Sequence, residues 1–307
     1  MLPEPLEHLL SLVDPGGCHV TNLPSRIWVF GGPIEVDRSK PTRSLRDSFW
    51  RQTLELASSE RWLADLDRPE AHDGWWAFSG YTDLLSFERD ACYLSKAVIL
   101  FAESPGSLAE LGALAIDDAL LPKLLVAVQS KFLTGDERES FLNLGPLRRV
   151  ETSGYRCVIS TDDTCSLGVD DFDVVVEAVS SWLPNTPHKT VFHPQNPTHQ
   201  LLLLADLVDI LLVTKVADLK AAAAYFNVVW SDEELLRALN LLDFFGLVKK
   251  EYRGKEPFFV RKIRSSAPWI DYTGKGAVKF DRARFKVDIE KSIQSDARRR
   301  AMFSRAQ

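Results

Sequence analysis

The sequence predicts an α/β protein, in which a doubly wound parallel sheet precedes a C-terminal winged helix-turn-helix domain. Two observations predict the sheet. Short apolar runs alternate with amphipathic segments through residues 1–189, and two of these runs lead directly into glycine loops. Strands that are apolar along their whole length are typical of parallel sheets covered by helices on both faces. The third observation is a helix, turn, helix and basic hairpin pattern within residues 190–307.

The predicted strands and helices follow each other in regular order. The apolar runs that predict strands are 26–30, 98–101, 123–129 and 155–160. The segments that predict helices between and after them are 44–59, 81–96, 134–144 and 170–183. In such sheets, ligands bind beyond the carboxyl ends of the strands, where the strand order reverses. We therefore expect nucleotide binding by the loops after the first two strands, at Phe30, Gly31, Gly32, Pro33, Ser104, Gly106 and Ser107.

The second glycine loop leads into a helix that carries a glutamate. Ser107 is placed to be the N-cap, and Glu110 follows three residues later, which is the spacing of a capping box. Backbone N–H groups at such a helix start are able to face a phosphate. Glu110 therefore has two interpretations. It either caps its own helix or lies beside the ligand that the loop holds.

Charge is divided unequally along the 307-residue chain, whose net charge is -6. Residues 190–307 carry 20 Lys and Arg against 14 Asp and Glu, and from residue 246 the counts are 17 against 7. This asymmetry favours an anionic partner over a merely solvated basic face. A proline-rich segment, 184–197, predicts the linker between a first domain of residues 1–189 and a second of residues 190–307.

Cysteine usage and hydropathy predict a cytoplasmic protein without a membrane segment. The four cysteines form no C-x-x-C pair, so we expect neither disulfides nor a metal site. The first residues lack the basic flank and apolar core of a signal peptide. The most apolar segment, 201–213, contains two aspartates and is too short to span a bilayer.

Two stretches resemble the signature loops of the nucleoside 2-deoxyribosyltransferase family, VFGGP at 29–33 and ESPGSLAELGALA at 103–115. The second is similar to the loop of deoxyribosyltransferase-like effector proteins of bacterial retrons, which add a C-terminal winged helix. The resemblance implies that Glu110 attacks or stabilises the anomeric carbon. Asp83 or Glu88 would then orient a ribose hydroxyl or the water.

The sequence departs from the transferase pattern at two positions. Val29 stands where the family usually has a tyrosine, and Ser104 stands where it usually has an aspartate. The lost hydroxyl and carboxylate groups favour plain glycosidic cleavage over base exchange. Breaking a ribose N-glycosidic bond passes through an oxocarbenium-like state that one carboxylate is able to stabilise.

The second domain has the pattern of a winged helix-turn-helix. Helices are expected over 198–215, 218–226 and 231–245, followed by a hairpin of 247–252 and 258–263. Its candidate nucleic-acid-binding residues are Lys249, Lys250, Arg253, Lys255, Arg261 and Lys262. The helix from Ser231 begins with three acids, so we expect contacts with a nucleic-acid backbone or a nucleoprotein. The arginine-rich tail is expected to order only on binding.

The resulting hypothesis is a retron toxin of antiphage defence that cleaves NAD or a related nucleotide. The resemblance implies that a reverse transcriptase and its multicopy single-stranded DNA–RNA hybrid hold the toxin inactive until infection, and that the protein is an oligomer. NAD is the expected substrate, and no cofactor is expected. Two alternatives remain open: a nucleotide-sensing DNA-binding regulator without catalysis, and a transferase acting on deoxynucleosides.

Overall fold

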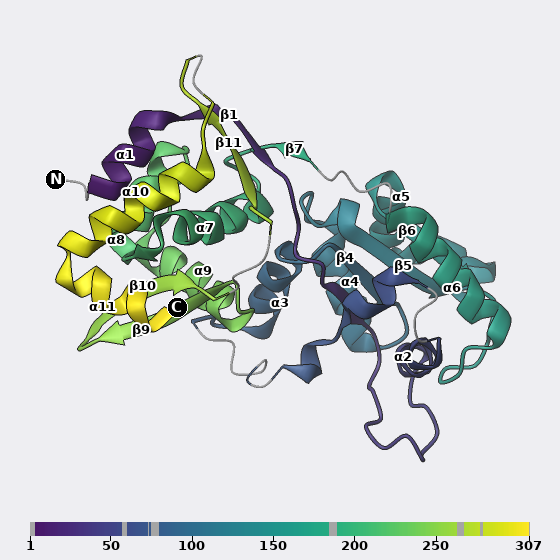
Figure 1. The fold of residues 1–307 in the computed structure, drawn as a ribbon. Coiled ribbons are helices and arrows are strands. Elements are labelled where there is room, and N and C mark those ends of the chain that lie inside the picture. Colours follow the sequence, from purple (N-terminus) through teal and green to yellow (C-terminus); the bar gives the residue numbers. More distant parts are fainter. Residues whose placement is uncertain are drawn as a thin grey trace. The chain divides into compact units, whose positions relative to one another are not determined.

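The computed structural model (Figure 1) describes residues 4–56, 60–72, 74, 80–183, 189–262, 267–276 and 279–306. The chain forms two compact units. The sheet unit comprises Pro24–Phe78 and Asp83–Pro187, and the terminal unit comprises Met1–Leu23, Ser79–Thr82 and His188–Gln307.

The sheet unit contains a five-stranded parallel sheet in the order β3-β2-β4-β5-β6. Its strands are β2 (Ile27–Phe30), β3 (Leu66–Asp67), β4 (Ala97–Phe101), β5 (Leu124–Gln129) and β6 (Tyr155–Ile159). The chain runs from β2 outward to β3 and then returns to β4 on the other side of β2. The strand order therefore reverses between β2 and β4, which is the switch point of a Rossmann-like sheet. The predicted parallel sheet is confirmed.

Helices cover both faces of this sheet. They are α2 (Leu45–Glu55), α3 (Leu84–Tyr93), α4 (Pro105–Ala115), α5 (Arg148–Ser153) and α6 (Val169–Trp182). Phe49 of α2 and Phe172 of α6 pack with Val29 and Ile99 in one core. On the opposite face, the Trp28 indole donates a hydrogen bond to the Ala91 carbonyl of α3 at 3.3 Å.

One predicted helix of the sheet unit is wrong. Residues 134–144 contain the 3-10 turn η6 (Gly135–Glu139) and the start of the π-helical turn η7 (Asn143–Leu147). Another 3-10 turn, η5 (Ser130–Leu133), precedes them. Gly135 has a φ of +60°, a conformation that ends regular helix, and Pro146 lies inside the π turn. Other 3-10 turns are η1 (Arg61–Asp65), η2 (Pro69–Ala71) and η4 (Leu121–Lys123).

The terminal unit contains two antiparallel three-stranded sheets, ordered β11-β1-β7 and β8-β10-β9. Their strands are β1 (Val13–Val20), β7 (Thr190–Val191), β8 (Val213–Thr214), β9 (Val248–Arg253), β10 (Glu256–Arg261) and β11 (Ile270–Gly274). The helices are α1 (Glu4–Leu12), α7 (Pro197–Leu211), α8 (Val216–Tyr225), α9 (Asp232–Phe244), α10 (Arg282–Ser295) and α11 (Ala297–Ala306). The predicted hairpin is confirmed, and so are the helices before it, except that the helix predicted over 198–215 ends at Leu211. Leu212 has a φ of +65°, which ends the helix, and Val213–Thr214 form the strand β8.

Both ends of the chain differ from expectation. The sequence predicts residues 1–23 within the first domain, but they belong to the terminal unit, because β1 pairs with β11 from Val13 opposite Gly274 to Val20 opposite Ile270. The tail is the helix α11 and not a disordered segment. Arg299 is only 7% exposed and donates to the Asp218 carboxylate at 2.7 Å. Within the described residues, no helix is both long and apolar enough to cross a membrane.

Candidate functional site

The loops that follow β2 and β4 meet at the switch point and are joined by Glu103. The Glu103 carboxylate accepts hydrogen bonds from the backbone N–H groups of Gly32 at 2.7 Å, Leu45 at 2.5 Å and Arg46 at 3.1 Å. Burial raises the pKa of Glu103, although these three N–H donors act in the opposite direction. The Gly32 N–H and the α2 start, both potential phosphate donors, therefore already bind a carboxylate of the chain itself.

The two glycines after β2 allow this close approach. Gly31 has a φ of +153°, and a Cβ there would lie 2.8 Å from the Arg46 Cβ. A Cβ on Gly32 would lie 2.6 Å from the Ser44 Cβ. The Pro33 carbonyl accepts the Ser44 hydroxyl at 2.9 Å. Packing of the loop against α2 thus explains the glycines, and a nucleotide contact at residues 31–33 stays a prediction.

The N-cap of α4 is Ser104, so the assignment of Ser107 as N-cap is wrong. Ser107 N–H donates to Ser104 Oγ at 3.2 Å, and Ser104 N–H donates to Ser107 Oγ at 2.9 Å. The capping box is therefore closed by two serines, with Gly106 exposed in the first turn. Glu110 lies in the second turn, beyond the orphan N–H groups of the helix start. This geometry removes the interpretation of Glu110 as a cap.

Glu110 instead lies at a small cavity of about 10 Å³, roughly the space of one water. The other lining residues are Phe30, Leu85, Glu88, Arg89 and Leu114. Glu110 Oε2 is buried and has no hydrogen-bond partner. Burial, followed by the negative charge of Glu88, raises the pKa of Glu110 to about 7, while the positive charge of Arg46 opposes the shift.

Asp83 and Glu88, the two acids predicted to assist Glu110, differ in whether they reach the Glu110 cavity. Asp83 is exposed and caps α3, and its carboxylate accepts from Ser86 N–H at 2.7 Å and Ser86 Oγ at 3.1 Å. Glu88, one turn further along α3, lines the cavity with Glu110. Of the two, Glu88 is thus the acid that the fold brings to Glu110.

Arg46 is a site residue that sequence reasoning missed. It is only 3% exposed, and its guanidinium donates to Glu70 through Nη1 at 2.8 Å and Nη2 at 2.7 Å. Nη1 also reaches the Gly32 carbonyl at 3.3 Å, whereas Nε is buried without a partner. In the sequence, Arg46 is one of several polar residues in an amphipathic segment. No local signal distinguishes it from a solvated arginine.

In the terminal unit, the predicted nucleic-acid-binding residues lie on or beside the β9–β10 hairpin. Lys255 and Lys262 are exposed. Lys249 pairs with Glu251 at 2.5 Å, Lys250 donates to Asn240 at 3.1 Å, and Arg253 donates to the Ala297 carbonyl at 2.9 Å. These last three residues keep a positive charge near the surface, but each already has a partner within the unit.

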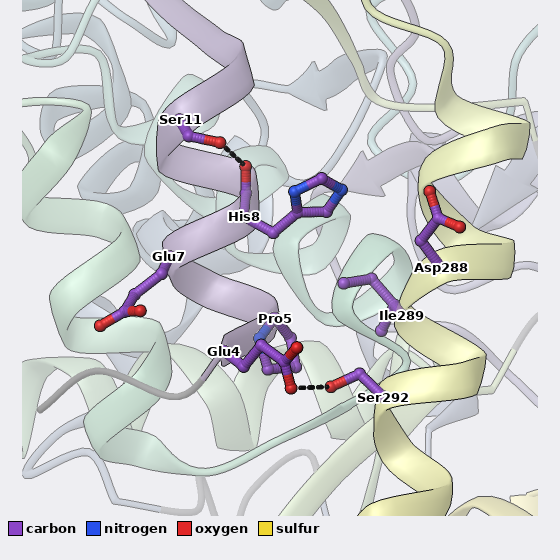
Figure 2. Close-up of a pocket in the computed structure, with 8 residues that line it drawn as sticks. All are labelled: Glu4, Pro5, Glu7, His8, Ser11, Asp288, Ile289 and Ser292. Atoms are coloured by element: carbon purple, nitrogen blue, oxygen red, sulfur yellow. Dashed lines mark hydrogen bonds between the residues drawn. The ribbon is translucent and has the colours of Figure 1, made fainter.

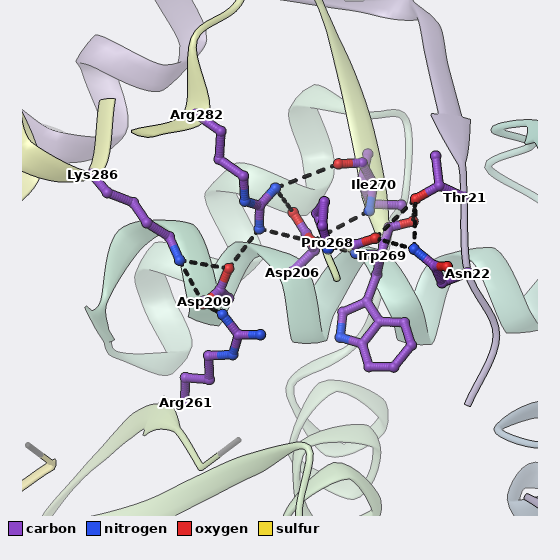
Figure 3. Close-up of polar contacts among 10 residues, drawn as sticks. All are labelled: Thr21, Asn22, Asp206, Asp209, Arg261, Pro268, Trp269, Ile270, Arg282 and Lys286. Carbon is purple, nitrogen blue, oxygen red and sulfur yellow. Dashed lines mark hydrogen bonds and ion pairs between the residues drawn. The ribbon is translucent and has the colours of Figure 1, made fainter. Parts of the chain in front are cut away.

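Arg261, one of the predicted nucleic-acid-binding residues, is directed toward an acidic residue of its own unit. Figure 3 shows its guanidinium directed to Asp209 of α7, which also accepts from Arg282 at 2.6 Å and Lys286 at 2.8 Å. Burial raises the pKa of Asp209, but its hydrogen bonds to Lys286 and Arg282 more than offset this, so the pKa lies below its ordinary value. Asp206 holds the other end of this network. Its Oδ1 accepts from Trp269 N–H at 2.9 Å.

A larger pocket of about 470 Å³ lies between α1 and α10 (Figure 2). The His8 ring is directed toward α10, and Glu4 accepts the Ser292 hydroxyl at 3.0 Å. None of the predicted site residues lines this pocket. Among the described residues, no group of three or more His, Cys, Asp and Glu side chains is arranged to hold a metal ion.

Comparison with known proteins places these features in context. The model of the STM3845 retron effector protein family matches residues 42–250. A candidate ribosyltransferase/DNA-binding protein of retron Ec86 from Escherichia coli is 30% identical over 149 residues, which cover 48% of this chain and 44% of that protein. Its counterpart from retron Ec73 is 35% identical over 68 residues, 22% of this chain and 21% of that protein. The chain therefore spans less than half the length of these curated relatives.

Proposed function

The chain belongs to the STM3845 retron effector protein family, and from this premise we propose that its sheet unit cleaves the N-glycosidic bond of NAD or a related nucleotide. The observation that carries the proposal is Glu110 Oε2, a buried carboxylate oxygen without a hydrogen-bond partner beside the switch point. Ligands of doubly wound sheets bind at this place. The names of the two relatives, which include ribosyltransferase, support chemistry at a ribose carbon.

The proposed reaction is hydrolysis at the anomeric carbon of the nicotinamide ribose. The C1′–N bond breaks and its electron pair neutralises the pyridinium, so nicotinamide leaves without needing a proton. Glu110 stabilises or traps the oxocarbenium-like sugar, as carboxylates do in glycoside hydrolysis. Water forms the new C1′–O bond and releases one proton, which a carboxylate of pKa about 7 is suited to accept. The products are nicotinamide, ADP-ribose and a proton.

The direct test is product analysis of the full chain with NAD, ATP and deoxynucleosides in parallel. We expect nicotinamide and ADP-ribose from NAD, and a loss of at least about 10³-fold in Glu110→Gln. Glu177→Gln, the same change at an exposed position of α6, should retain full activity. Equal turnover by Glu110→Gln would remove the catalytic assignment. Exchange between two added bases would instead favour the transferase.

We further propose that α8, α9 and the β9–β10 hairpin act as a winged helix-turn-helix that contacts a retron reverse transcriptase and its hybrid RNA–DNA product. The element order and the antiparallel sheet β8-β10-β9 support this assignment. The α9 start carries Asp232, Glu233 and Glu234. Acids at this position would be repelled by the phosphates that border a major groove. Contacts of the hairpin lysines with phosphates are therefore favoured over insertion of α9 into the groove.

Binding experiments separate this effector from a non-catalytic regulator. The effector should bind the RNA–DNA hybrid without sequence preference and with a steep salt dependence, and the complete retron assembly should cleave NAD more slowly than the free chain. A regulator should instead bind one duplex sequence in preference to scrambled controls. Sequence-specific duplex binding without NAD cleavage would overturn the proposal.

A further inference from the structure

A smaller pocket lies next to the one drawn in Figure 2, between α1 and the start of α10. It is lined by His8 and Leu12 of α1 and by residues of the segment 279–288, all within the terminal unit. Its volume is about 250 Å³. Sites for drug-sized ligands usually have about 300–1,000 Å³, so this pocket suits a fragment of the size of a single base.

Three aromatic rings line this pocket and are in contact through Phe285. The His8 and Phe285 rings are stacked, with their centroids 5.3 Å apart and their planes inclined by 16°. The centroid of the Phe280 ring lies 5.5 Å from that of Phe285. Phe285 is only 2% exposed, whereas His8 and Phe280 are partly exposed. The open surface of these two rings is therefore available to a flat ligand that stacks on it.

Two cations of the pocket are left for a ligand. Among the described residues, the exposed side chains of Lys279 and Arg284 form no hydrogen bond or ion pair. The two acids of the pocket already have partners. Asp281 accepts from the Arg284 backbone N–H at 3.0 Å, and Asp288 Oδ1 lies 3.7 Å from Lys291 Nζ. The charges without partners are thus both positive, which favours an anionic ligand.

Rings and cations together select one class of ligand. An inorganic phosphate would leave the ring surface unused, and Lys279 and Arg284 would repel an ammonium group. A nucleotide suits both features, because its base stacks on aromatic rings and its phosphate attracts cations. In a duplex, however, the base is enclosed by stacking and pairing, and a protein reaches its faces only after extruding it. The pocket therefore fits an unpaired nucleotide.

We propose that this pocket holds one base of a single-stranded nucleic acid, with the His8 and Phe280 rings against the base and the two unpaired cations against its phosphates. The strand leaves away from the pocket drawn in Figure 2, because Glu4 and Glu7 line that pocket and would repel phosphates. Base binding here requires neither NAD cleavage nor the β9–β10 hairpin, and so it goes beyond the proposed function.

The test measures binding of the full chain to a labelled single strand of about 10 nucleotides, to the same strand without bases, and to its duplex, by fluorescence anisotropy. The strand without bases keeps every phosphate. We expect the native chain to bind the intact strand about fivefold or more tightly than the baseless strand, since a stacked base contributes about that much. Phe280→Leu, which keeps an apolar side chain but no ring, should remove this preference and leave duplex binding unchanged. Phe280→Tyr, which restores the ring, should retain the preference.

Arg284→Gln tests the phosphate contact, and Arg300→Gln, at an exposed position of α11 outside the pocket, is its matched control. Arg284→Gln should lower the slope of log affinity against log salt by about 0.7, and Arg300→Gln should leave it unchanged. Lys255→Gln/Lys262→Gln removes the proposed hairpin contacts, and the preference for bases should persist in that background.

Equal affinity of the native chain for the intact and baseless strands would overturn the inference, whatever the outcome of the NAD and hairpin experiments. An equal loss of slope in the two arginine variants would also overturn it, because any surface cation would then serve. Equally tight binding of a peptide of alternating Glu and Tyr, with the same dependence on the Phe280 ring, would assign the pocket to an acidic protein segment instead.

Discussion

Glu103 and Glu110 lie seven residues apart at the same edge of the sheet, yet their carboxylates differ in hydrogen bonding. Both are partly buried, and burial raises the pKa of both. Glu103 accepts three backbone N–H groups, whereas Glu110 Oε2 accepts none. The first carboxylate joins two loops, and the second is left open to a ligand. Hydrogen-bond satisfaction, and not burial, separates a structural carboxylate from a candidate catalytic one.

Glu103→Gln should destabilise the folded protein more than any other single change proposed for this site. The amide NH₂ group would face backbone N–H donors in place of a carboxylate oxygen, so about 2–4 kcal/mol of the free energy of unfolding should be lost. Urea unfolding of this variant beside Glu177→Gln measures the loss. A change below about 0.5 kcal/mol would contradict the structural role of Glu103.

Glu110→Gln, unlike Glu103→Gln, should increase the free energy of unfolding. The folded-state pKa of about 7 lies above the ordinary 4.5, so the native state binds the extra proton and native stability falls as pH rises from about 4.5 to 7. Removing this carboxyl should therefore stabilise the protein by roughly 1–2 kcal/mol at pH 8 and by little at pH 4.5. Unfolding curves at both pH values provide the measurement. Destabilisation at pH 8 would show that Glu110 is itself a structural carboxylate.

The pH profile of cleavage tests whether the ionised Glu110 carboxylate is the reactive form. If the ionised Glu110 is the reactive form, kcat/KM for NAD should rise about tenfold from pH 6 to pH 8, with a midpoint near 7. Steady-state rates in a constant-ionic-strength buffer would show the rise. A flat profile over this range would assign the reaction to a group other than Glu110.

The smallest effect is expected at the hairpin. Replacing the exposed Lys255 and Lys262 by glutamine should weaken binding of the RNA–DNA hybrid a few-fold and lower the slope of log affinity against log salt by about one to two. Arg253→Gln serves as the comparison variant. It removes a positive charge, as the lysine changes do, but also a hydrogen bond within the unit, because Arg253 donates to the Ala297 carbonyl. An unchanged salt slope in the Lys255/Lys262 variant would remove these lysines from the interface.

Much of the sheet unit is predictable because its strands are continuous apolar runs and its glycine loops follow them directly. The two-residue strand β3 carries no such pattern, and β1 contains Pro15, Gly16 and Gly17, which locally indicate a turn. β1 exists because it pairs with β11 about 250 residues later. Local periodicity contains no information about a pairing at that distance.

The α/β class, the switch-point loops and Glu110 as the residue to test all follow from the sequence. The three-dimensional packing was needed to show which polar groups already have hydrogen-bond partners. It showed that Glu103 binds the backbone donors of the first loop, that Ser104 caps α4 and that Arg261 faces Asp209. It also buried Arg46 Nε and Glu110 Oε2 without hydrogen-bond partners. Hydrogen-bond partners that come from distant segments depend on packing, and residue spacing along the chain does not encode them.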